Sequence, residues 1–548
     1  MIIDFSRFKD WSLVGDLFGG VTTAIVSLPL ALAFGVASGA GAEAGLWGAI
    51  LVGLFAALFG GSTSLISEPT GPMTVIMTAV LTSMLASYPE GGVAMAFTVV
   101  MMAGLFQITL GYLKLGKYIT LMPYSVISGF MSGIGVILII LQLAPFLGHP
   151  SPAGGVMGTI TALPNLILEL KFSELFLGAL TLGVLFYLPK KWRRLVPPQL
   201  VALVVVTLIS MLLFSDTGVR RIGEIPSGLP AIQWPHFGSE VMMEMVIDAL
   251  VLGTLGCIDT LLTAVIADSL TRKEHDSNRE LVGQGVANLF SGLLGGLPGA
   301  GATMGTVVNI QSGAKSPIAG IVRAFILLLV VLGASQLTSP IPMAVLAGIA
   351  LYVGINILDW SFLKRAHKVA LMPTIIMYGV MALTVFVDLM VAVGIGVFIA
   401  NIITIEKLSR LQSGNVKAIS DADDDVPLTE DERELLDQAE GRVLVFYLSG
   451  PMIFGVSKAI AKHHNRIHQY KAVVLDLSAV PMMDLTVSLA LENAIKDAIE
   501  AGCDVYIFSP NGQTTERLEK LGVMQRLPHN AFCDSRKSAL EHAVNNLS

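Results

Sequence analysis

Charged residues are scarce in this chain of 548 residues. Asp, Glu, Lys and Arg make up 14% of it, hydrophobic residues make up 53%, and the mean hydropathy is +0.72. Soluble globular domains carry about 25% charged residues, so the composition excludes an ordinary soluble protein. A chain this apolar needs a lipid bilayer as its solvent.

Strong charges are missing from whole stretches that are long enough to cross a membrane. Crossing a hydrocarbon core of roughly 30 Å takes about 20 helical residues. The uncharged stretches are residues 17–42, 44–67, 91–113, 118–168, 195–215 and 369–387. Dividing the longest apolar runs at Gly and Pro gives about fourteen hydrophobic segments. We therefore predict a polytopic α-helical membrane domain over residues 1–407.

The patterns that mark enzymes are also missing. Cys257, Cys503 and Cys533 are too few and too scattered for a disulfide framework or a metal site. The nine histidines show no metal-ligand spacing, and no Gly-rich loop ends in Lys-Ser or Lys-Thr to hold a phosphate. We expect no enzymatic activity, no ATP-driven pump, no cofactor and no nucleic-acid partner.

Two short breaks interrupt apolar runs about 230 residues apart. Residues Ile66–Met73 read Ile-Ser-Glu-Pro-Thr-Gly-Pro-Met, and residues Leu297–Met304 read Leu-Pro-Gly-Ala-Gly-Ala-Thr-Met. Similarly placed breaks are typical of inverted repeats, so we predict about seven plus seven segments with two half-helices that meet at the membrane midplane. The alternative is that Gly and Pro are simply common in membrane helices.

Positive charge gathers in alternate loops between the segments. The clusters are Arg7 and Lys9; Lys114 and Lys117; Lys190, Lys191, Arg193 and Arg194; Arg272, Lys273 and Arg279; and Lys364, Arg365 and Lys368. Lys and Arg near segment ends stay on the cytoplasmic side, which predicts a multi-pass protein of the inner (plasma) membrane with both termini in the cytoplasm. Arg220 and Arg221 are the exception, in a longer loop where this rule is weaker.

The last third of the chain is more polar and follows another periodicity. Residues 408–440 carry an acidic run that is too charged to bury, which predicts a linker or a solvated helix. Strand patterns occur at 443–448, 472–477 and 505–508, and helix patterns at 485–501 and 515–521. The alternation predicts a soluble α/β domain over residues 441–548 on the cytoplasmic side.

Asp259 is the sharpest candidate for a functional residue. It lies inside the apolar stretch Val246–Ile266, where a carboxylate costs roughly 2.5–3.5 kcal/mol. Thr263 follows one helical turn later on the same face, so the two side chains could offer oxygen ligands to a hard cation. The alternative is an aspartate that faces a water-filled crevice and serves helix packing only.

The two breaks supply the complementary chemistry for an anion. A half-helix that starts inside the bilayer exposes free backbone N–H groups and the positive end of its dipole. One would begin near Thr70–Met73 and the other near Gly301–Met304, and the glycines there would let an anion approach the backbone. The Thr70 and Thr303 hydroxyls could donate a hydrogen bond or ligate a cation, although each threonine could instead be a helix N-cap.

Other acidic residues carry weaker signals. Glu68 precedes the first break, and we expect it to pair with a basic group or to sit in a hydrated vestibule. Solvated ion pairing is the prediction for the acidic residues of one basic loop, which are Asp268, Glu274, Asp276 and Glu280. Asp388 lies between two apolar runs and is typical of a turn.

The stretch Asn278–Asn288, Asn-Arg-Glu-Leu-Val-Gly-Gln-Gly-Val-Ala-Asn, is followed by Ser291-Gly292 and Gly295-Gly296. This pattern resembles the signature of the SulP family of anion permeases, and the resemblance extends over essentially the whole chain. The region from about residue 441 resembles the STAS domain that ends many of these permeases. Within the family, residues 16–39, 66–73 and 256–313 are more similar to the sodium-dependent bicarbonate transporters.

The resemblance implies a fold and a mechanism. It implies a seven-plus-seven inverted repeat with core and gate subdomains, an elevator-like movement, and a homodimer held largely through the STAS domains. It also implies a site that binds both ions. The sodium ligands would be Asp259, Thr263, Gly301, Ala302 and Thr303, and bicarbonate would meet Thr70, Ala302 and Thr303. Sodium would supply the positive charge that some family members place as an arginine at the second half-helix.

Two other functions remain open at this point. The chain could be a permease for sulfate or a small carboxylate that is coupled to protons through Asp259. It could also be a membrane-anchored STAS scaffold or sensor, although an intact and costly aspartate argues against a decayed permease. The STAS part departs from the anti-sigma antagonists, because Met483-Asp484-Leu485-Thr486 has leucine where those proteins carry a phosphorylated serine. Regulation by phosphorylation is therefore not expected at this position, and Thr486 and Ser488 are weaker candidates for it.

Overall fold

The computed structural model describes residue 7 and most of residues 12–547. The residues within that range that it leaves out are 117–122, 153, 190–191, 193–195, 215–217, 224–227, 239, 334–337, 370, 388, 422–425, 454–455, 465–466, 511, 524, 526 and 529–530. The chain divides into two compact units, Met1–Phe398 and Ile399–Ser548, and each is described by itself. Asp388 and several of the basic loop residues lie outside the described part.

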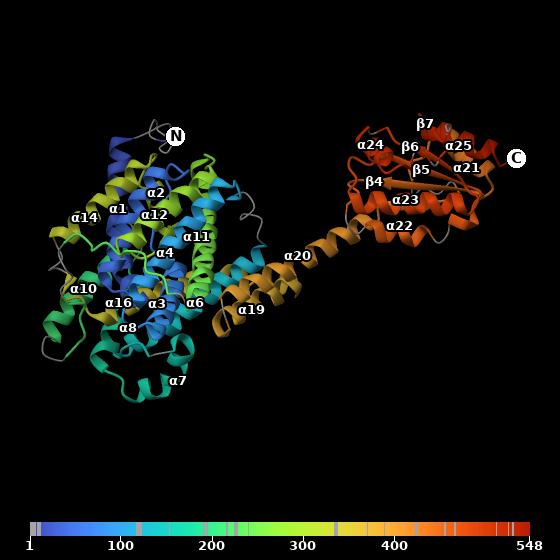
Figure 1. Ribbon diagram of the computed structural model, residues 1–548. Coiled ribbons are helices and arrows are strands. Elements are labelled where there is room, and N and C mark those ends of the chain that lie inside the picture. Colours follow the sequence, from blue (N-terminus) through green and yellow to red (C-terminus); the bar gives the residue numbers. More distant parts are fainter. Residues whose placement is uncertain are drawn as a thin grey trace. The chain divides into compact units, whose positions relative to one another are not determined.

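The first unit is almost entirely helical (Figure 1). Its helices are α1 (Leu13–Ser38), α2 (Ala42–Phe59), α3 (Gly71–Ser87), α4 (Gly92–Tyr112), α6 (Tyr124–Phe146), α7 (Gly155–Leu168), α8 (Phe172–Tyr187), α10 (Pro198–Leu213), α11 (Met242–Thr271), α12 (Ser277–Leu293), α13 (Thr303–Gln311), α14 (Ile318–Gly333), α16 (Met343–Ile357), α17 (Trp360–Leu363), α18 (Ala366–Val369), α19 (Leu371–Phe386) and the start of α20 (Leu389–Ser413). Within the described residues, α1, α2, α4, α6 and α11 are long and apolar enough to cross a membrane, and α7 with α8 forms a sixth candidate bent by 115°. Five shorter apolar helices accompany them.

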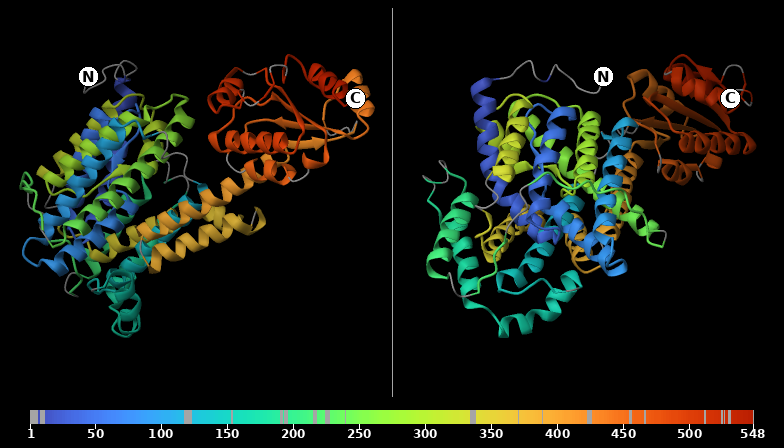
Figure 2. Two further views of the ribbon diagram at one scale, coloured as in Figure 1. Left: turned by 45° about the vertical axis from the view of Figure 1, so that its right-hand side comes forward. Right: turned by 60° about the vertical axis from the view of Figure 1, so that its left-hand side comes forward.

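The helices of the first unit pack in two groups. A first bundle is formed by α1, α2, α4, α11, α12 and α14, against which α3 and α13 pack, and a second bundle is formed by α6, α8, α10, α16 and α19. Figure 2 shows the first unit in two further views. In the first bundle, α4 and α12 approach closely at Gly104 and Gly285. A Cβ atom added at either glycine would lie 2.5 Å from the other's carbonyl oxygen, so larger side chains would force these helices apart.

Two short strands connect the halves of the first bundle. Strand β1 (Ser67–Glu68) pairs antiparallel with β2 (Ala300–Gly301), so that Ser67 lies opposite Gly301 and Glu68 opposite Ala300. Helix α3 starts three residues after Glu68, and α13 starts two residues after Gly301. The prediction of two helices that begin at the two breaks is therefore confirmed, and the pairing brings both starts to one place.

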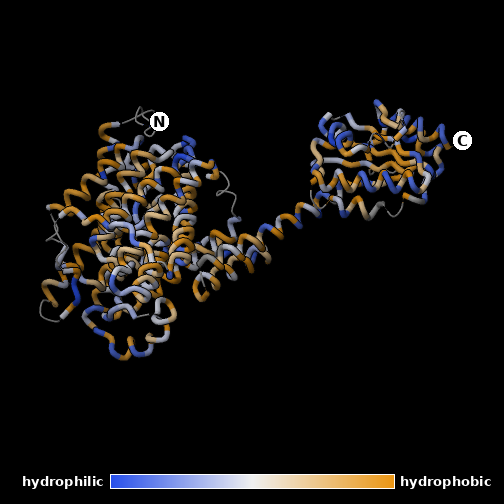
Figure 3. The backbone as a smooth tube through the Cα atoms, viewed as in Figure 1, coloured by the Kyte–Doolittle hydropathy of each residue, from blue (hydrophilic) through white to orange (hydrophobic). Residues whose placement is uncertain are grey.

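The hydropathy of the chain agrees with a membrane environment for the first unit. Hydrophobic residues run along its helices, as Figure 3 shows. Large apolar side chains on the outer helices are exposed, among them Leu212 at 81% and Phe325 at 60%. Water would penalise such a surface, and lipid would not.

The second unit contains a five-stranded sheet with the order β3-β4-β5-β6-β7. The strands are β3 (Val416–Ile419), β4 (Val443–Ser449), β5 (Ala472–Ala479), β6 (Asp504–Phe508) and β7 (Phe532–Cys533). Strand β3 is antiparallel to β4, and the other neighbours are parallel. The helices are α21 (Glu430–Gln438), α22 (Val456–His464), α23 (Leu485–Glu500), α24 (Gly512–Lys520) and α25 (Arg536–Asn545).

Two apolar cores lie on opposite faces of this sheet. Alternate residues of β4 and β5 point into one core with α22 and α23, or into the other with α21 and α25. The predicted strands at 443–448, 472–477 and 505–508 are confirmed as β4, β5 and β6. The predicted helices correspond to α23 and α24, and Asp484 caps α23 by accepting from the Val487 amide at 2.8 Å.

The range 408–440 is more ordered than a plain linker. It holds the end of α20, the whole of β3, and α21, which begins with a capping box between Thr429 and Glu432. The sequence did not predict these elements. Strand β3 is short, and α21 has an acidic surface and buries few residues, such as Leu436. Asp423, Asp424 and Asp425 of the acidic run lie outside the described part.

Candidate functional site

A cavity of about 560 Å³ opens where the two half-helices begin. The first bundle contributes residues of α1, β1, α3, α11, β2 and α13, and the second bundle contributes Met131 of α6 and residues of α16. The lining residues are Leu30, Phe34, Glu68, Pro69, Thr70, Gly71, Pro72, Met131, Asp259, Gly301, Ala302, Thr303, Met304, Val307, Val308, Val353, Asn356 and Ile357. The cavity therefore lies between the two bundles of the first unit.

Asp259 lies on α11 and reaches this cavity. Its side chain accepts a hydrogen bond from the Thr70 hydroxyl, with 2.8 Å between Oγ1 and Oδ2. Among the described lining residues there is no Lys, Arg or His. The carboxylate therefore has a neutral partner at the start of α3, and its negative charge is available to a cation.

Thr263 stands one turn beyond Asp259 and is fully buried beside the cavity rather than in its lining. Its hydroxyl donates to the Gly301 carbonyl at 2.8 Å and lies 2.9 Å from the Thr303 hydroxyl. The Gly301 amide donates to Thr260 at 3.0 Å. A Cβ atom at Gly301 would lie 3.0 Å from the Thr260 Cα, so a side chain there would push β2 away from α11.

These contacts gather several oxygen atoms in a small space. Hard monovalent and divalent cations prefer oxygen ligands. The oxygen atoms available here belong to the Asp259 carboxylate, the Thr263 and Thr303 hydroxyls and the Gly301 carbonyl. Within the described residues, no group of three or more His, Cys, Asp or Glu comes together. A cation here would be held by one carboxylate with hydroxyl and carbonyl oxygens.

The half-helix starts contribute positive potential to the same cavity. Helix α3 begins at Gly71 after Thr70, and α13 begins at Thr303 after Ala302. Neither start has a side-chain cap, so its first backbone N–H groups keep their capacity to bind an anion. The alternative that the threonines serve as N-caps holds for Thr70 by position only, because it is the N-cap residue of α3 but its hydroxyl bonds to Asp259. It is wrong for Thr303, which is the first residue of α13 after the N-cap Ala302.

Two amides of the family-like signature hold the break before α13. The Asn288 side chain accepts from the Gly299 amide at 2.8 Å and donates to the Gly299 carbonyl at 3.0 Å. Gln284 donates to the same carbonyl at 2.8 Å, and Asn288 also donates to Gln107 at 2.9 Å. Both residues belong to the sequence motif Asn278–Asn288, which did not by itself indicate this role. Amide side chains inside an apolar helix were the available signal, because buried polar groups need partners.

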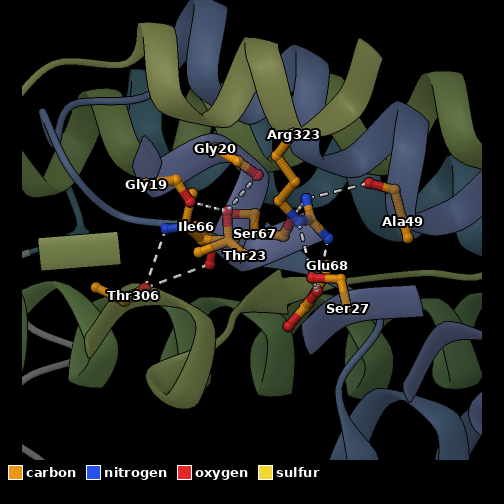
Figure 4. A network of polar contacts seen from close by, with 10 residues as sticks. All are labelled: Gly19, Gly20, Thr23, Ser27, Ala49, Ile66, Ser67, Glu68, Thr306 and Arg323. Atoms are coloured by element: carbon orange, nitrogen blue, oxygen red, sulfur yellow. Dashed lines mark hydrogen bonds and ion pairs between the residues drawn. The ribbon is translucent and has the colours of Figure 1, made fainter. Parts of the chain in front are cut away.

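Glu68 pairs with a basic group that the sequence analysis did not name. Arg323 of α14 donates from Nη2 to Glu68 Oε2 at 2.5 Å, and both side chains are buried (Figure 4). The available signal was a lone arginine inside the apolar helix Ile318–Gly333, which is as costly in a membrane as a lone aspartate. The two residues lie 255 positions apart, so no local pattern could join them.

Of the acidic residues predicted to form solvated ion pairs, Asp268 pairs with His275, whereas Glu280 and Asp276 accept from backbone amides instead. Glu280 is buried and accepts from the Gly61 and Ser62 amides at 2.7 Å each, because these amides follow the end of α2 and need an acceptor. Asp268 contacts His275 at 2.6 Å. Asp276 caps α12 by accepting from the Asn278 and Arg279 amides.

A polytopic helical bundle with two broken segments around a buried carboxylate is the architecture of a secondary transporter. Residues 13–380 match the sulfate permease family, and residues 436–539 match the STAS domain. The chain therefore belongs to the sulfate permease (SulP) family and ends in a STAS domain, as the resemblance predicted. Its family is one of transporters rather than of enzymes.

Similar proteins of the family cover nearly the whole chain. The bicarbonate transporter BicA of Synechocystis sp. is 62% identical over 533 residues, which is 97% of this chain and 94% of that protein. The putative sulfate transporter YvdB of Bacillus subtilis is 29% identical over 545 residues, 96% of this chain and 98% of that protein.

Solved structures agree with the fold. The transmembrane domain of a cyanobacterium bicarbonate transporter BicA matches with a TM-score of 0.66 at 62% identity and covers 71% of this chain and 98% of its own. The murine Solute Carrier 26 family member A9 anion transporter in the inward-facing state matches with a TM-score of 0.82 at 20% identity, over 98% of this chain and 92% of its own. The predicted fold class, a polytopic helical membrane domain with a C-terminal α/β STAS domain, is confirmed.

Proposed function

We propose that this chain is a sodium-dependent bicarbonate symporter that takes up the anion by secondary active transport. The observation that carries the proposal is the cavity in which the Asp259 carboxylate lies beside two uncapped half-helix starts. Asp259 offers a place for a cation, and the helix starts offer a place for an anion. The 62% identity to a bicarbonate transporter supports bicarbonate as that anion.

The proposed ligands divide between the two ions. Sodium would contact Asp259, Thr263, Gly301, Ala302 and Thr303, which agrees with the oxygen atoms gathered there. Bicarbonate would contact Thr70, Ala302 and Thr303, whose backbone positions lie at the two helix starts. Ala302 and Thr303 would thus serve both ions.

A charge argument explains why the two ions would travel together. Without a cation, the carboxylate of Asp259 would repel a bicarbonate ion in the same cavity. Bound sodium would remove that repulsion and attract the anion, by roughly 4 kcal/mol at about 4 Å and an effective dielectric of 20. One sodium for each bicarbonate would also make the transport cycle electroneutral.

The movement would be elevator-like. The first bundle holds the ion-binding residues and the second bundle covers one side of the cavity with Met131 and residues of α16. Sliding of the first bundle against the second would carry the site across the membrane while its internal contacts remain intact. A cysteine crosslink between α1 and α16, which pack together, should stop uptake, and its reduction should restore it.

Two further proposals concern the membrane and the assembly. Both termini would be cytoplasmic, with residues 1–407 as the transport domain, 408–440 as its connector and 441–548 as the STAS domain. The chain would form a homodimer through the STAS domain, for which the exposed apolar side chains Met482 and Leu485 offer a surface. Crosslinking of Met482→Cys chains in membranes tests the dimer, and monomeric protein throughout would contradict it.

Uptake into proteoliposomes tests the central proposal. An inward sodium gradient should drive labelled bicarbonate uptake, and replacing sodium with potassium should abolish it. A panel of labelled sulfate and small carboxylates, assayed with a proton gradient in place of sodium, tests the main alternative. Uptake of sulfate driven by protons alone would replace the proposal with a proton-coupled sulfate permease. Absence of any uptake would favour a scaffold or sensor.

A further inference from the structure

The cavity wall carries two carboxylates, Glu68 and Asp259. Two negative charges beside an anion site would oppose anion binding unless at least one is compensated. Asp259 receives its hydrogen bond from the neutral Thr70 hydroxyl, whereas Glu68 is paired with the Arg323 guanidinium at 2.5 Å. The three ionisable side chains together therefore leave one uncompensated negative charge at the cavity.

The guanidinium of Arg323 is held in place independently of Glu68. Its Nε donates to Ser27 at 2.9 Å, and its Nη1 donates to the carbonyl oxygens of Ala49 at 3.3 Å and Ser67 at 3.2 Å. Ser27 in turn contacts the Glu68 carboxylate. Figure 4 shows the arginine reaching from α14 toward α1, α2 and β1. Neutralising Glu68 would therefore leave most of the arginine's partners in position.

The packing around the guanidinium also restricts its position. A Cβ atom added at Gly53 of α2 would lie 2.3 Å from Arg323 Nη1, so only glycine leaves room for the charged group between α2 and α14. Glu68 has its other carboxylate oxygen near the start of α13, because a Cβ atom at Gly305 would lie 3.2 Å from Oε1. Arg323 thus lies inside the first bundle, and Glu68 lies at the cavity next to the second half-helix.

We propose that the Glu68–Arg323 pair sets the net charge of the transport cavity and thereby fixes its demand for a single monovalent cation. Arg323 cancels the charge of Glu68, which leaves Asp259 as the charge that one sodium ion neutralises. This inference rests on the proposed sodium-coupled transport. It assigns the pair a role in ion specificity, although neither side chain needs to touch the transported ions.

Three variants change the cavity charge in a defined order. Glu68→Gln leaves Arg323 uncompensated and brings the cavity to neutrality, while its amide can still accept from the guanidinium and Ser27. Arg323→Gln doubles the negative charge. The double variant restores the single negative charge of the natural protein without either member of the ion pair.

The experiment measures the sodium concentration for half-maximal bicarbonate uptake in proteoliposomes of the full chain. Glu68→Gln should raise this value roughly tenfold, because removing one negative charge from the cavity wall weakens the attraction of the site for sodium. Arg323→Gln should lower it by a similar factor, and the double variant should return it toward the natural value. Maximal uptake reports the amount of folded transporter and is scored separately.

A second, partly buried ion pair in the same unit provides the control. Glu174 is fully buried and accepts from Arg220 at 2.9 Å, and neither residue lines the cavity. Glu174→Gln with Arg220→Gln should lower maximal uptake through stability and leave sodium half-saturation unchanged. An unchanged half-saturation value in Glu68→Gln, or a double variant that stays at the single-variant value, would overturn the role in charge setting. If Arg323→Gln fails to insert, the other two variants still decide.

The failure of this inference differs from failure of the proposed function. A natural protein that takes up bicarbonate without sodium would refute the symport itself. A natural protein that depends on sodium, with half-saturation insensitive to Glu68→Gln, would refute only the role of the ion pair.

Discussion

Replacing Asp259 with asparagine should abolish sodium-dependent uptake while the protein still folds. Asparagine has the same shape, and its Oδ1 can still accept the hydrogen bond from Thr70 that is 2.8 Å long. No basic residue lines the cavity in the described part of the chain, so removing the carboxylate leaves no buried base without a partner. The substitution therefore changes the charge of the site and little else.

The size of the effect follows from Coulomb's law. A sodium ion about 4 Å from the carboxylate loses roughly 4 kcal/mol of attraction at an effective dielectric of 20. This corresponds to about a thousandfold weaker sodium binding. If the natural protein binds sodium in the millimolar range, no practical sodium concentration would then fill the site.

Calorimetry on the purified protein measures the sodium affinity, and proteoliposome uptake measures the transport. Cys257→Ala is the matched control, because this buried residue lies two positions earlier on α11 and outside the cavity lining. The control should retain sodium affinity and uptake. Near-natural sodium affinity in Asp259→Asn would refute the assignment of this residue as the cation ligand.

Further predictions concern the shared site and the soluble domain. Thr303→Val should weaken both sodium and bicarbonate binding in calorimetry, because it removes the hydroxyl that is proposed to contact both ions, and loss of one affinity alone would contradict a shared site. In the natural protein, sodium and bicarbonate should tighten each other's binding by the same factor, since coupling between ligands is reciprocal. An isolated domain of residues 414–548 should unfold cooperatively on heating, whereas a fragment of residues 441–548 should be largely unfolded by circular dichroism. Removing β3 and α21 exposes several apolar side chains, and burying each contributes about 1.5–3 kcal/mol to the free energy of unfolding. Equal stability of the two fragments would show that these elements contribute nothing. Burial would raise the pKa of Glu432, but hydrogen bonds from Arg536 and from the Thr429 amide lower it overall. Its stabilising contribution is therefore complete above the ordinary glutamate pKa of about 4.3 and is lost as pH falls through the lower folded value. Acid titration of the 414–548 domain should show this loss, and Arg536→Gln should reduce it; an unchanged acid transition would contradict the pairing.

The sequence was most informative where a residue type is unfavourable in a membrane helix. A carboxylate in an apolar helix identified Asp259, and helical spacing added Thr263. Gly and Pro in apolar runs located the starts of α3 and α13. The paired breaks and the family resemblance both predicted that these two helix starts meet, and the β1–β2 pairing supplies the physical reason.

Contacts between distant parts of the chain could not be predicted in the same way. Glu68 and Arg323 are 255 positions apart, and Asp16 accepts from the Ser316 amide across 300 positions. Each polar residue indicates only that a partner must exist, because an unpaired buried charge is costly. Strand β3 was missed because it is four residues long and follows directly on α20.

The most direct test of sodium-coupled symport measures labelled sodium and labelled bicarbonate uptake in the same proteoliposomes while the membrane current is recorded. Under one-to-one symport, each ion should stimulate uptake of the other, the two fluxes should be equal, and the net current should be close to zero. Bicarbonate uptake that proceeds unchanged without sodium, or a sustained current that accompanies it, would contradict electroneutral sodium-coupled symport.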